Sequence, residues 1–321
     1  MVLARFGLLA FIATALATPV LYDGRAPLNY TSADIDGPKP PYVYVVKGSK
    51  PASEVGPQLY SSPTNSPQYV SFSSSPPPTP LWANKGQPIE QSISTKIDNS
   101  SVFVPGGNPA NSQWGFRRTE LIAQNNRTML QSGKSVWHFS IMRDDTRPLN
   151  YSHEYQIVFI EPDDGSHVFG VRVGSPFTVP TADKLPVKTA HSLQVLDHAT
   201  NVIYSTQFDR NTWHNFAVQV DWDARTLGVF ASKGGSKLKK VSKLVENSSA
   251  KSGSAGQGDF HIGLIKLPIA NPKDTAADQS DVVRHGLQDV PAPEGLYYSG
   301  VFVESTTGGV SAGFAATIPA F

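Results

Sequence analysis

Short segments in which polar and apolar residues alternate recur along this chain, and they constrain its fold more than any other feature. Alternation at period two indicates a β-strand with one buried face, because successive side chains of a strand point to opposite sides. The eight clearest segments span residues 115–124, 135–143, 153–161, 167–173, 213–221, 226–232, 260–267 and 296–304. Turn-forming residues separate them, and the 26 Gly and 26 Pro of the chain agree with frequent turns. The pattern predicts an all-β domain of two packed sheets.

The segment TWHNFAVQVDWDARTLGVFASKGG, residues 212–235, is the best-defined hairpin of the series. It resembles the hairpins of lectin-like and glucanase jelly rolls, in which an aromatic strand turns after an Asp and returns as an apolar strand. We therefore expect a β-jelly-roll sandwich with a concave substrate-binding sheet. Residues 47–80 are rich in Ser and Pro, and we expect a long surface loop or an ordered arm there, so no second domain is predicted.

The first residues have the pattern of an export signal. Arg5 precedes an uncharged apolar run, and Ala15 and Ala17 occupy the minus-three and minus-one positions of a cleavage site. The run is too short to span a bilayer, which needs about 20 apolar residues, and no later segment of the sequence comes close. We expect a signal peptide at residues 1–17 and one domain at residues 18–321, secreted, extracellular and not bound to a membrane.

The chain contains no cysteine, so an exported domain of this sequence cannot rely on disulfides. A chain of 321 residues can bury enough apolar surface to fold without them. Five Asn-x-Ser/Thr sequons agree with export and predict a glycoprotein. They are at Asn29, Asn99, Asn126, Asn150 and Asn247.

The charge of the chain is balanced. It has 27 Lys and Arg against 26 Asp and Glu, and removal of Arg5 with the signal peptide leaves 26 of each. Such a chain lacks the basic footprint of a nucleic-acid-binding protein. No metal-ligand motif is present, although Asp98, Asp163 and Asp164 lie near Gly or Asn and leave a structural calcium site as a minor alternative. We expect a monomer without a cofactor that binds neither nucleic acid nor a membrane.

Polar residues repeat on one face of three predicted strands. The first carries Arg118 and Glu120, the second His138, and the third Glu154 and Gln156. Side chains two residues apart in a strand share a face, so we expect these five to line one cleft if the three strands are neighbours.

Two carboxylates in one cleft are what cleavage of a glycosidic bond requires, one as general acid and the other as base or nucleophile. Glu120 and Glu154 are the candidates, and Glu161 is a rival that the alternation places on the opposite face. In a simple meander the strands of Glu120 and Glu154 are second neighbours, about 10 Å apart at the backbone. Side chains that lean inward across a concave sheet shorten this to about 7–9 Å, a spacing that favours inversion. The alternative is that each Glu is an exposed strand residue paired with Arg.

Three further residues are weaker candidates for binding substrate. His261 alternates with apolar neighbours and either reaches the cleft or is a structural histidine. Trp82 and Trp114 flank the cleft strands in sequence and are the preferred platform for stacking a sugar, although aromatic residues more often fill cores.

Six segments resemble signature blocks of glycoside hydrolase family 131. They are SVFVPGGNPANSQWGFRRTELIAQ, HFSI, RPLNYSHEYQIVFIEPDDGSHVFG, TWHNFAVQVDW, GQGDFHIGLIKLP and EGLYYSGVFVE, which together span nearly all of the mature chain. The resemblance implies a single secreted, fungal-type catalytic domain that hydrolyses β-1,3- and β-1,6-linked glucans, with β-1,4-linked glucan as a further substrate. Its Arg-Thr-Glu motif carries a catalytic role onto Glu120. Its second glutamate falls in the block at residues 153–162, where the facing argument selects Glu154 ahead of Glu161.

Two other functions fit a jelly roll of this kind. A polysaccharide lyase would use Arg118, Gln156, a histidine and a tyrosine, and its acidic substrates would favour a basic groove, which the balanced charge does not support. A non-catalytic glycan-binding module would need no paired carboxylates.

Overall fold

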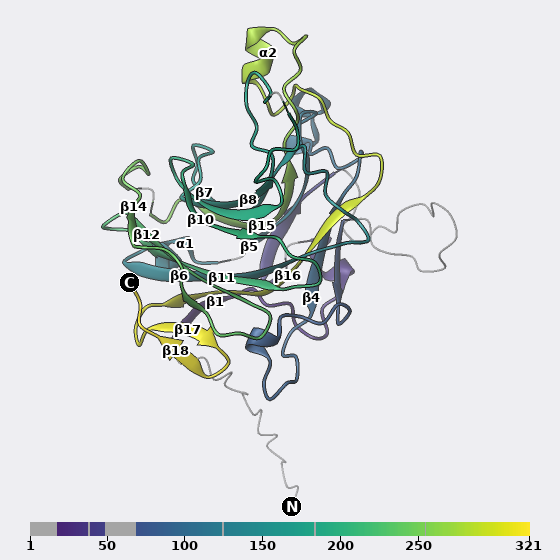
Figure 1. The fold of residues 1–321 in the computed structure, drawn as a ribbon. Helices are drawn as coiled ribbons and strands as arrows, with labels where there is room; N and C mark the ends of the chain where they lie inside the picture. Colours follow the sequence, from purple (N-terminus) through teal and green to yellow (C-terminus); the bar gives the residue numbers. More distant parts are fainter. Residues whose placement is uncertain (1–17, 38, 49–68, 124, 183, 254) are drawn as a thin grey trace, which may run out of the picture.

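The computed structural model describes residues 18–37, 39–48, 69–123, 125–182, 184–253 and 255–321. The predicted signal peptide and most of the Ser- and Pro-rich segment lie outside these residues. Two large antiparallel sheets pack face to face, which confirms the predicted sandwich (Figure 1). Each of the eight predicted strands is present, with its ends within two residues of the expected positions.

The first sheet, called here sheet I, has the strand order β10-β9-β8-β7-β15-β5-β2. Its strands are β2 Tyr42–Val46, β5 Arg117–Ala123, β7 Glu154–Glu161, β8 Phe169–Gly174, β9 Ser192–Asp197, β10 Val202–Gln207 and β15 Asp259–Lys266. The central position of β15 matters most for function, because this strand lies between β5 and β7.

The second sheet, sheet II, has the order β13-β12-β11-β6-β16-β4-β3, with β1 beside β16 and β14 beside β12. Its strands are β1 Val20–Asp23, β3 Val70–Ser73, β4 Ser92–Ile97, β6 Lys134–Arg143, β11 His214–Asp221, β12 Thr226–Lys233, β13 Lys239–Lys240, β14 Val245–Glu246 and β16 Glu294–Ser305. The meander expected for β5, β6 and β7 is wrong, because the chain passes to sheet II at β6 and returns to sheet I at β7.

Short elements complete the described part of the chain. They are the hairpin of β17 Val310–Gly313 and β18 Ala316–Ile318, the helices α1 Arg127–Leu130 and α2 Ala276–Ser280, and 3-10 turns at Ser32–Ile35, Pro80–Trp82, Pro105–Gly107 and Pro109–Asn111. The α2 segment projects beyond sheet I (Figure 1). Among the described residues no helix is long and apolar enough to cross a membrane.

The main core lies between the two sheets. Trp137 and Phe139 of β6 face Ile157 and Ile160 of β7 across it, and each is at most 1% exposed. Burial of each such side chain contributes about 1.5–3 kcal/mol. A second apolar cluster covers the other face of sheet II, where Trp82 and Phe302 pack together.

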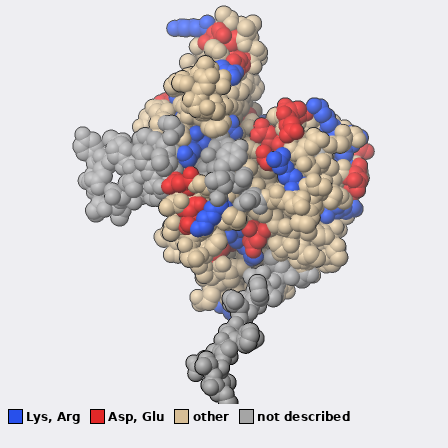
Figure 2. Space-filling view, turned by 180° about the vertical axis from the view of Figure 1, so that it is seen from behind, with Lys and Arg blue, Asp and Glu red and all other residues tan. Residues whose placement is uncertain are grey.

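The surface agrees with a balanced charge. Lys and Arg side chains are interspersed with Asp and Glu on the face shown in Figure 2. Four of the predicted sequons present a partly or fully exposed Asn, whereas Asn247 is 3% exposed. Its amide donates to the carbonyl of Val168 at 2.8 Å and accepts from the backbone of His198 at 2.9 Å. Asn247 is therefore a structural residue in the folded domain and not an open glycan acceptor.

Candidate active site

A groove of about 700 Å³ lies on the outer face of sheet I. Strands β5, β7 and β8 supply most of its floor, the loop after β9 supplies one side, and Val282 and Val283, which follow α2, supply another. The polar side chains along it include Arg118, Glu154, Gln156, Glu161 and Arg172. The groove thus brings together Arg118 of β5 with Glu154 and Gln156 of β7, and the role of these side chains stays a prediction.

Four ionisable side chains form a continuous chain of contacts at one end of the groove. Arg118 holds Glu120 through two bonds, Nε to Oε1 at 2.5 Å and Nη2 to Oε2 at 3.0 Å. The Nδ1 atom of His261 lies 2.9 Å from Oε2 of Glu120, and its Nε2 atom lies 3.4 Å from Oε2 of Glu161. One imidazole therefore separates the two carboxylates.

The two carboxylates of this chain have opposite electrostatic environments. Burial would raise the pKa of Glu120, whose side chain is 0% exposed, but the charge of Arg118 and the hydrogen bond from His261 outweigh it and hold the pKa below its usual value. Burial raises the pKa of Glu161, and the negative charge of Glu120 adds to the increase, while His261 partly offsets it. The side chain of Glu161 is 33% exposed to the groove. Glu120 is thus kept ionised, and Glu161 holds its proton to higher pH than an ordinary glutamate.

A β-bulge in β7 explains why Glu161 faces the groove. The register of β7 against β8 shifts between Gln156 and Val158, and the side chains of Ile157 and Val158 are both buried in the core. Beyond this point Phe159 and Glu161 line the groove. The expectation that Glu161 lies on the opposite face is therefore wrong, because the bulge inserts one residue and reverses the alternation.

The neighbouring strand β15 is also irregular, at a position close to the bulge in β7. The register of β15 against β7 shifts between Ile262 and Ile265, and a Cβ at Gly263 would lie 2.2 Å from the carbonyl oxygen of Thr119. Only glycine therefore fits beside β5 at the level of Glu120. From sheet II the hydroxyl of Tyr298 donates to the carbonyl of Gly263 at 2.5 Å and also lies 3.3 Å from the carbonyl of Ile157. Tyr298 ties the two irregular segments together.

Phe159 fixes the orientation of the central histidine. Its ring stacks on the imidazole of His261 at a centroid distance of 4.5 Å and on that of His167 at 4.2 Å. Burial lowers the pKa of His167 to about 4, with a further contribution from His261, so His167 is neutral at neutral pH. Stacking on the ring of Phe159 limits rotation of His261 and keeps its nitrogens directed at the two carboxylates.

Glu154 lines the groove, but it does not face Glu120. The backbone carbonyl of Glu154 accepts from Leu267 of the central segment, whereas Glu120 pairs with Gly263, four residues earlier. The Glu154 carboxylate accepts from the backbone N–H of Phe177 at 2.8 Å and from Gln156 at 3.1 Å. Glu154 and Glu161 stand at opposite ends of β7, about 23 Å apart along the strand. Acid and base in a glycosidase are typically no more than about 9.5 Å apart, so Glu154 and Glu161 do not form one catalytic pair.

Two of the predicted binding residues lie elsewhere. His138 of β6 belongs to sheet II and is 0% exposed, with Nε2 at 2.9 Å from Glu304, so it cannot contact a substrate in the groove. Trp82 is 2% exposed and packs edge-on against His138 and Phe302. The prediction for His138 failed because the outer face of sheet II is covered by a second layer of chain, and Trp82 is part of that layer.

The remaining predicted residues lie at or near the groove. Arg118 and Gln156 line it, and His261, which is 5% exposed, lies between Glu120 and Glu161. Trp114 is 61% exposed and lies in the chain between the groove residues Gln113 and Phe116, a position compatible with a sugar-stacking platform.

Sequence reasoning missed Arg172 of β8. It stands opposite Gln156 in the neighbouring strand, lines the groove and donates to Gln194 at 2.9 Å. The alternation in FGVRVG, in which Arg172 is the one polar side chain, could have identified it. Among the described residues no group of three or more His, Asp or Glu is arranged to hold a metal ion.

A groove on the outer face of a jelly roll, lined by hydrogen-bonding and aromatic side chains and containing a glutamate whose pKa is raised, is typical of a carbohydrate-active enzyme. The chain belongs to glycoside hydrolase family 131, because residues 20–309 match the model of the glycoside hydrolase 131 catalytic N-terminal domain. It is therefore a glycoside hydrolase of a β-glucanase family, which confirms the resemblance seen in the sequence. Neither the lyase nor the binding-module alternative is supported.

Two solved structures are similar along most of their length. The GH131 β-glucanase catalytic domain from Podospora anserina is 25% identical, with a TM-score of 0.64 over 92% of this chain and 99% of that one. The catalytic domain of the family 131 protein from Coprinopsis cinerea is also 25% identical, with a TM-score of 0.63 over 92% of this chain and 97% of that one. No curated protein matches this chain.

Proposed function

We propose that this enzyme is secreted and hydrolyses β-1,3- and β-1,6-linked glucans, with β-1,4-linked glucan as a further substrate. The observation that carries the proposal is the contact chain Arg118–Glu120–His261–Glu161 at the floor of an open groove. The Podospora anserina domain is described as a β-glucanase, which supports the substrate class.

In this proposal Glu161 is the general acid. It is the carboxyl group of the contact chain that reaches the groove, and its raised pKa keeps it protonated at a pH where an ordinary glutamate is ionised. A protonated carboxyl group in the groove can donate its proton to the leaving oxygen of a glycosidic bond. Glu154 is not needed for this step and instead binds the glucan together with Gln156 and Arg172.

Glu120 is the second essential carboxylate and acts through His261. It is completely buried, so it does not touch the sugar, and its lowered pKa keeps it ionised. Its bond to Nδ1 fixes the imidazole so that Nε2 faces Glu161. His261 thereby holds Glu161 in position, while the attacking water loses its proton to the solvent and Glu161 is protonated again from the solvent. The positive charge of Arg118 neutralises the buried carboxylate of Glu120, which would otherwise be unpaired.

Secretion is proposed from the export pattern of residues 1–17, and the fold is compatible with cleavage before Thr18. Thr18 is 4% exposed, and its hydroxyl contacts Glu304 and lies 3.0 Å from the hydroxyl of Ser311. The residue that would begin the mature chain is thus part of the folded domain. N-glycans are proposed at Asn29, Asn99, Asn126 and Asn150.

The test compares the wild-type enzyme with Glu120→Gln on laminarin, pustulan and cellulose. We expect the wild type to release sugar from the first two, and Glu120→Gln to retain about a hundredth of the rate or less. Glu246→Gln, an exposed Glu of β14, is the matched control and should retain full activity. Retention of more than about a tenth of the rate by Glu120→Gln would contradict the role given to Glu120.

Proton NMR of the first product decides the stereochemistry. We propose inversion, because Glu120 is completely buried and cannot attack the anomeric carbon as the carboxylate nucleophile of a retaining enzyme does. The expected first signal is that of the α-anomer, and an initial β-anomer would mean retention.

A further inference from the structure

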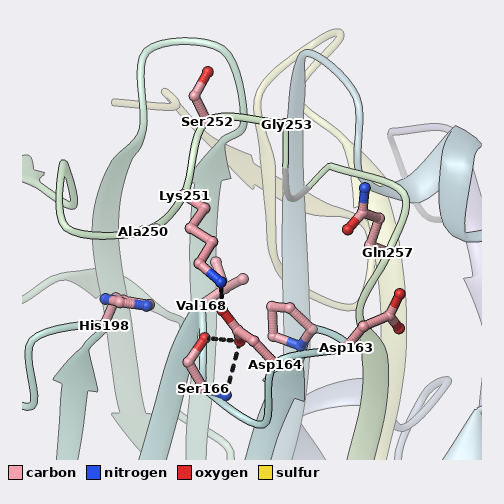
Figure 3. Close-up of a pocket in the computed structure, with 11 residues that line it drawn as sticks. Asp163, Asp164, Ser166, Val168, His198, Ala250, Lys251, Ser252, Gly253 and Gln257 are labelled. Atoms are coloured by element: carbon pink, nitrogen blue, oxygen red, sulfur yellow. Dashed lines mark hydrogen bonds and ion pairs between the residues drawn. The ribbon is translucent and has the colours of Figure 1, made fainter.

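A second cavity, of about 310 Å³, lies beyond the Glu161 end of the groove (Figure 3). Its lining comes from three parts of the chain, at residues 162–168, at His198, and at residues 250–253 with Gln257. We propose that this cavity, called here the end pocket, is a distal subsite that binds one end of the neutral glucan chain whose cleavage occurs at Glu161. The inference rests on the proposed function and extends it to product length.

The end pocket continues the groove. Ser166 and His198 line both cavities, and Pro162, which lines the end pocket, directly follows Glu161 in the chain. A Cβ at Gly165, between the two cavities, would lie 3.9 Å from Oε1 of Glu161. A chain that lies along the groove and passes Glu161 therefore enters the end pocket.

The charges of the end pocket indicate a neutral ligand. Lys251 is the one Lys or Arg that lines it, and its ammonium is paired with Asp164 at 2.5 Å. Asp164 also accepts from the hydroxyl and the backbone N–H of Ser166 at 2.5 and 3.0 Å (Figure 3). An acidic glycan or a phosphate would need a cation that is not already neutralised in this way. Sugar hydroxyl groups need only hydrogen-bond donors and acceptors.

Those donors and acceptors are present on the walls. Asp163, Ser252 and Gln257 are exposed and line the end pocket from two different loops. Two buried apolar residues, Val168 and Ala250, complete the lining. Polar groups that fix orientation around an apolar base are typical of a saccharide site. Because the end pocket has less than half the volume of the groove, we infer that it takes fewer sugar units.

The first experiment measures binding in the inactive Glu161→Gln background by calorimetry with laminari-oligosaccharides of increasing length. We expect the double variant Asp163→Ala/Gln257→Ala to bind long oligosaccharides about tenfold more weakly, since it loses about two hydrogen bonds, and short ones unchanged. Gln87→Ala, an exposed Gln beside the Pro80–Trp82 turn, is the control and should bind like its parent. Equal affinity of the double variant and its parent for long chains would overturn the inference. So would tighter binding of an oligouronate than of a neutral chain.

The second experiment follows products of the active enzyme. The double variant should give a shifted distribution of product lengths, while its rate on the shortest cleaved substrate stays within about twofold of wild type. Thermal melting checks that both exposed substitutions leave the domain folded. If wild type binds long chains through the end pocket but hydrolyses no β-glucan, the proposed function fails and the subsite remains. If it hydrolyses glucan with product lengths that the double variant does not alter, the subsite fails alone.

Discussion

Two buried His–Glu pairs occur in this protein, one in each sheet, and their contacts have the same length. His261 lies 2.9 Å from Glu120 in sheet I, and His138 lies 2.9 Å from Glu304 in sheet II. Each joins two neighbouring strands, β15 to β5 in one case and β6 to β16 in the other. The chemistry of the two pairs is the same, so their surroundings decide what each does.

The surroundings differ in access to water. In sheet I the pair continues through His261 to Glu161, which is one-third exposed to the groove. In sheet II the imidazole of His138 stacks on Phe302 at 4.2 Å and meets the edge of Trp82 at 5.5 Å. Glu304 is satisfied there by the backbone and hydroxyl of Ser311, both at 2.7 Å. We call these the open pair and the sealed pair. In the proposed mechanism the open pair serves the glutamate that protonates the substrate, whereas the sealed pair stabilises the fold.

The largest expected effect is the loss of activity in Glu161→Gln. The amide cannot donate the proton that the leaving oxygen needs, so kcat/KM should fall by about 10²–10⁴. The melting temperature should change little, because the side chain is partly exposed. Glu304→Gln in the sealed pair is the comparison and should keep the activity of each folded molecule. A residual rate in Glu161→Gln above about a tenth of wild type would remove the distinction between the two pairs.

His138→Ala should have the opposite signature. It leaves the Glu304 carboxylate buried without its imidazole partner, and breaking a buried pair in this way costs about 3–5 kcal/mol of unfolding free energy. Urea unfolding measures the loss, and the activity per folded molecule should be unchanged. His285→Ala, whose side chain is 40% exposed, controls for removal of a histidine and should shift the midpoint little. A stability equal to wild type would show that the sealed pair contributes nothing to the fold.

Glu90, a buried residue bonded to β16 of sheet II, should make the stability of the protein depend on pH. Its carboxylate accepts from the N–H of Gly300 at 3.0 Å, and burial raises its pKa to about 7, although this bond and the charge of Arg25 oppose the increase. Between about pH 4.5 and 7 the folded state therefore binds one proton more than the unfolded state at this residue. Stability should fall as pH rises through this window, by about 3 kcal/mol in total. Glu90→Gln imitates the neutral form and should remove this component of the slope. Urea unfolding at pH 5, 6 and 7 measures it, and parallel slopes for both proteins would contradict the prediction.

The sequence predicted the strands that alternate clearly, and it predicted Arg118 and Glu120 on the groove face of β5. The prediction for His138 failed because alternation only assigns a side chain to one face of its strand. Which sheet the strand joins, and which layer covers that sheet, depend on long-range packing. Trp82 failed because its place next to the cleft strands in sequence does not reveal that its turn packs on sheet II. The cover over sheet II comes partly from β17 and β18, far from β6 in the sequence.

Glu161 shows a different limit. The residues around the β7 bulge are Ile157, Val158 and Phe159, all apolar, so no polar residue marks the point where the alternation reverses. The irregular segment is set by Gly263 and Tyr298, which come from distant parts of the chain. A strand read by itself therefore cannot reveal which face its last residue occupies.

The smallest expected effect is a change in the pH dependence of the open pair. Activity requires protonated Glu161, so kcat/KM should fall as pH rises through the raised pKa of this residue. His261 lowers that pKa, because the positive charge it carries when protonated favours the ionised carboxylate. Removing the imidazole in His261→Gln therefore raises the pKa of Glu161, and the alkaline limb of the pH profile should move to higher pH while the maximal rate falls. His138→Gln makes the same substitution in the sealed pair and should leave the limb in place. If both variants move the limb equally, the shift comes from a general loosening of the sandwich. If His261→Gln instead moves the alkaline limb to lower pH, the prediction that His261 lowers the pKa of Glu161 is wrong.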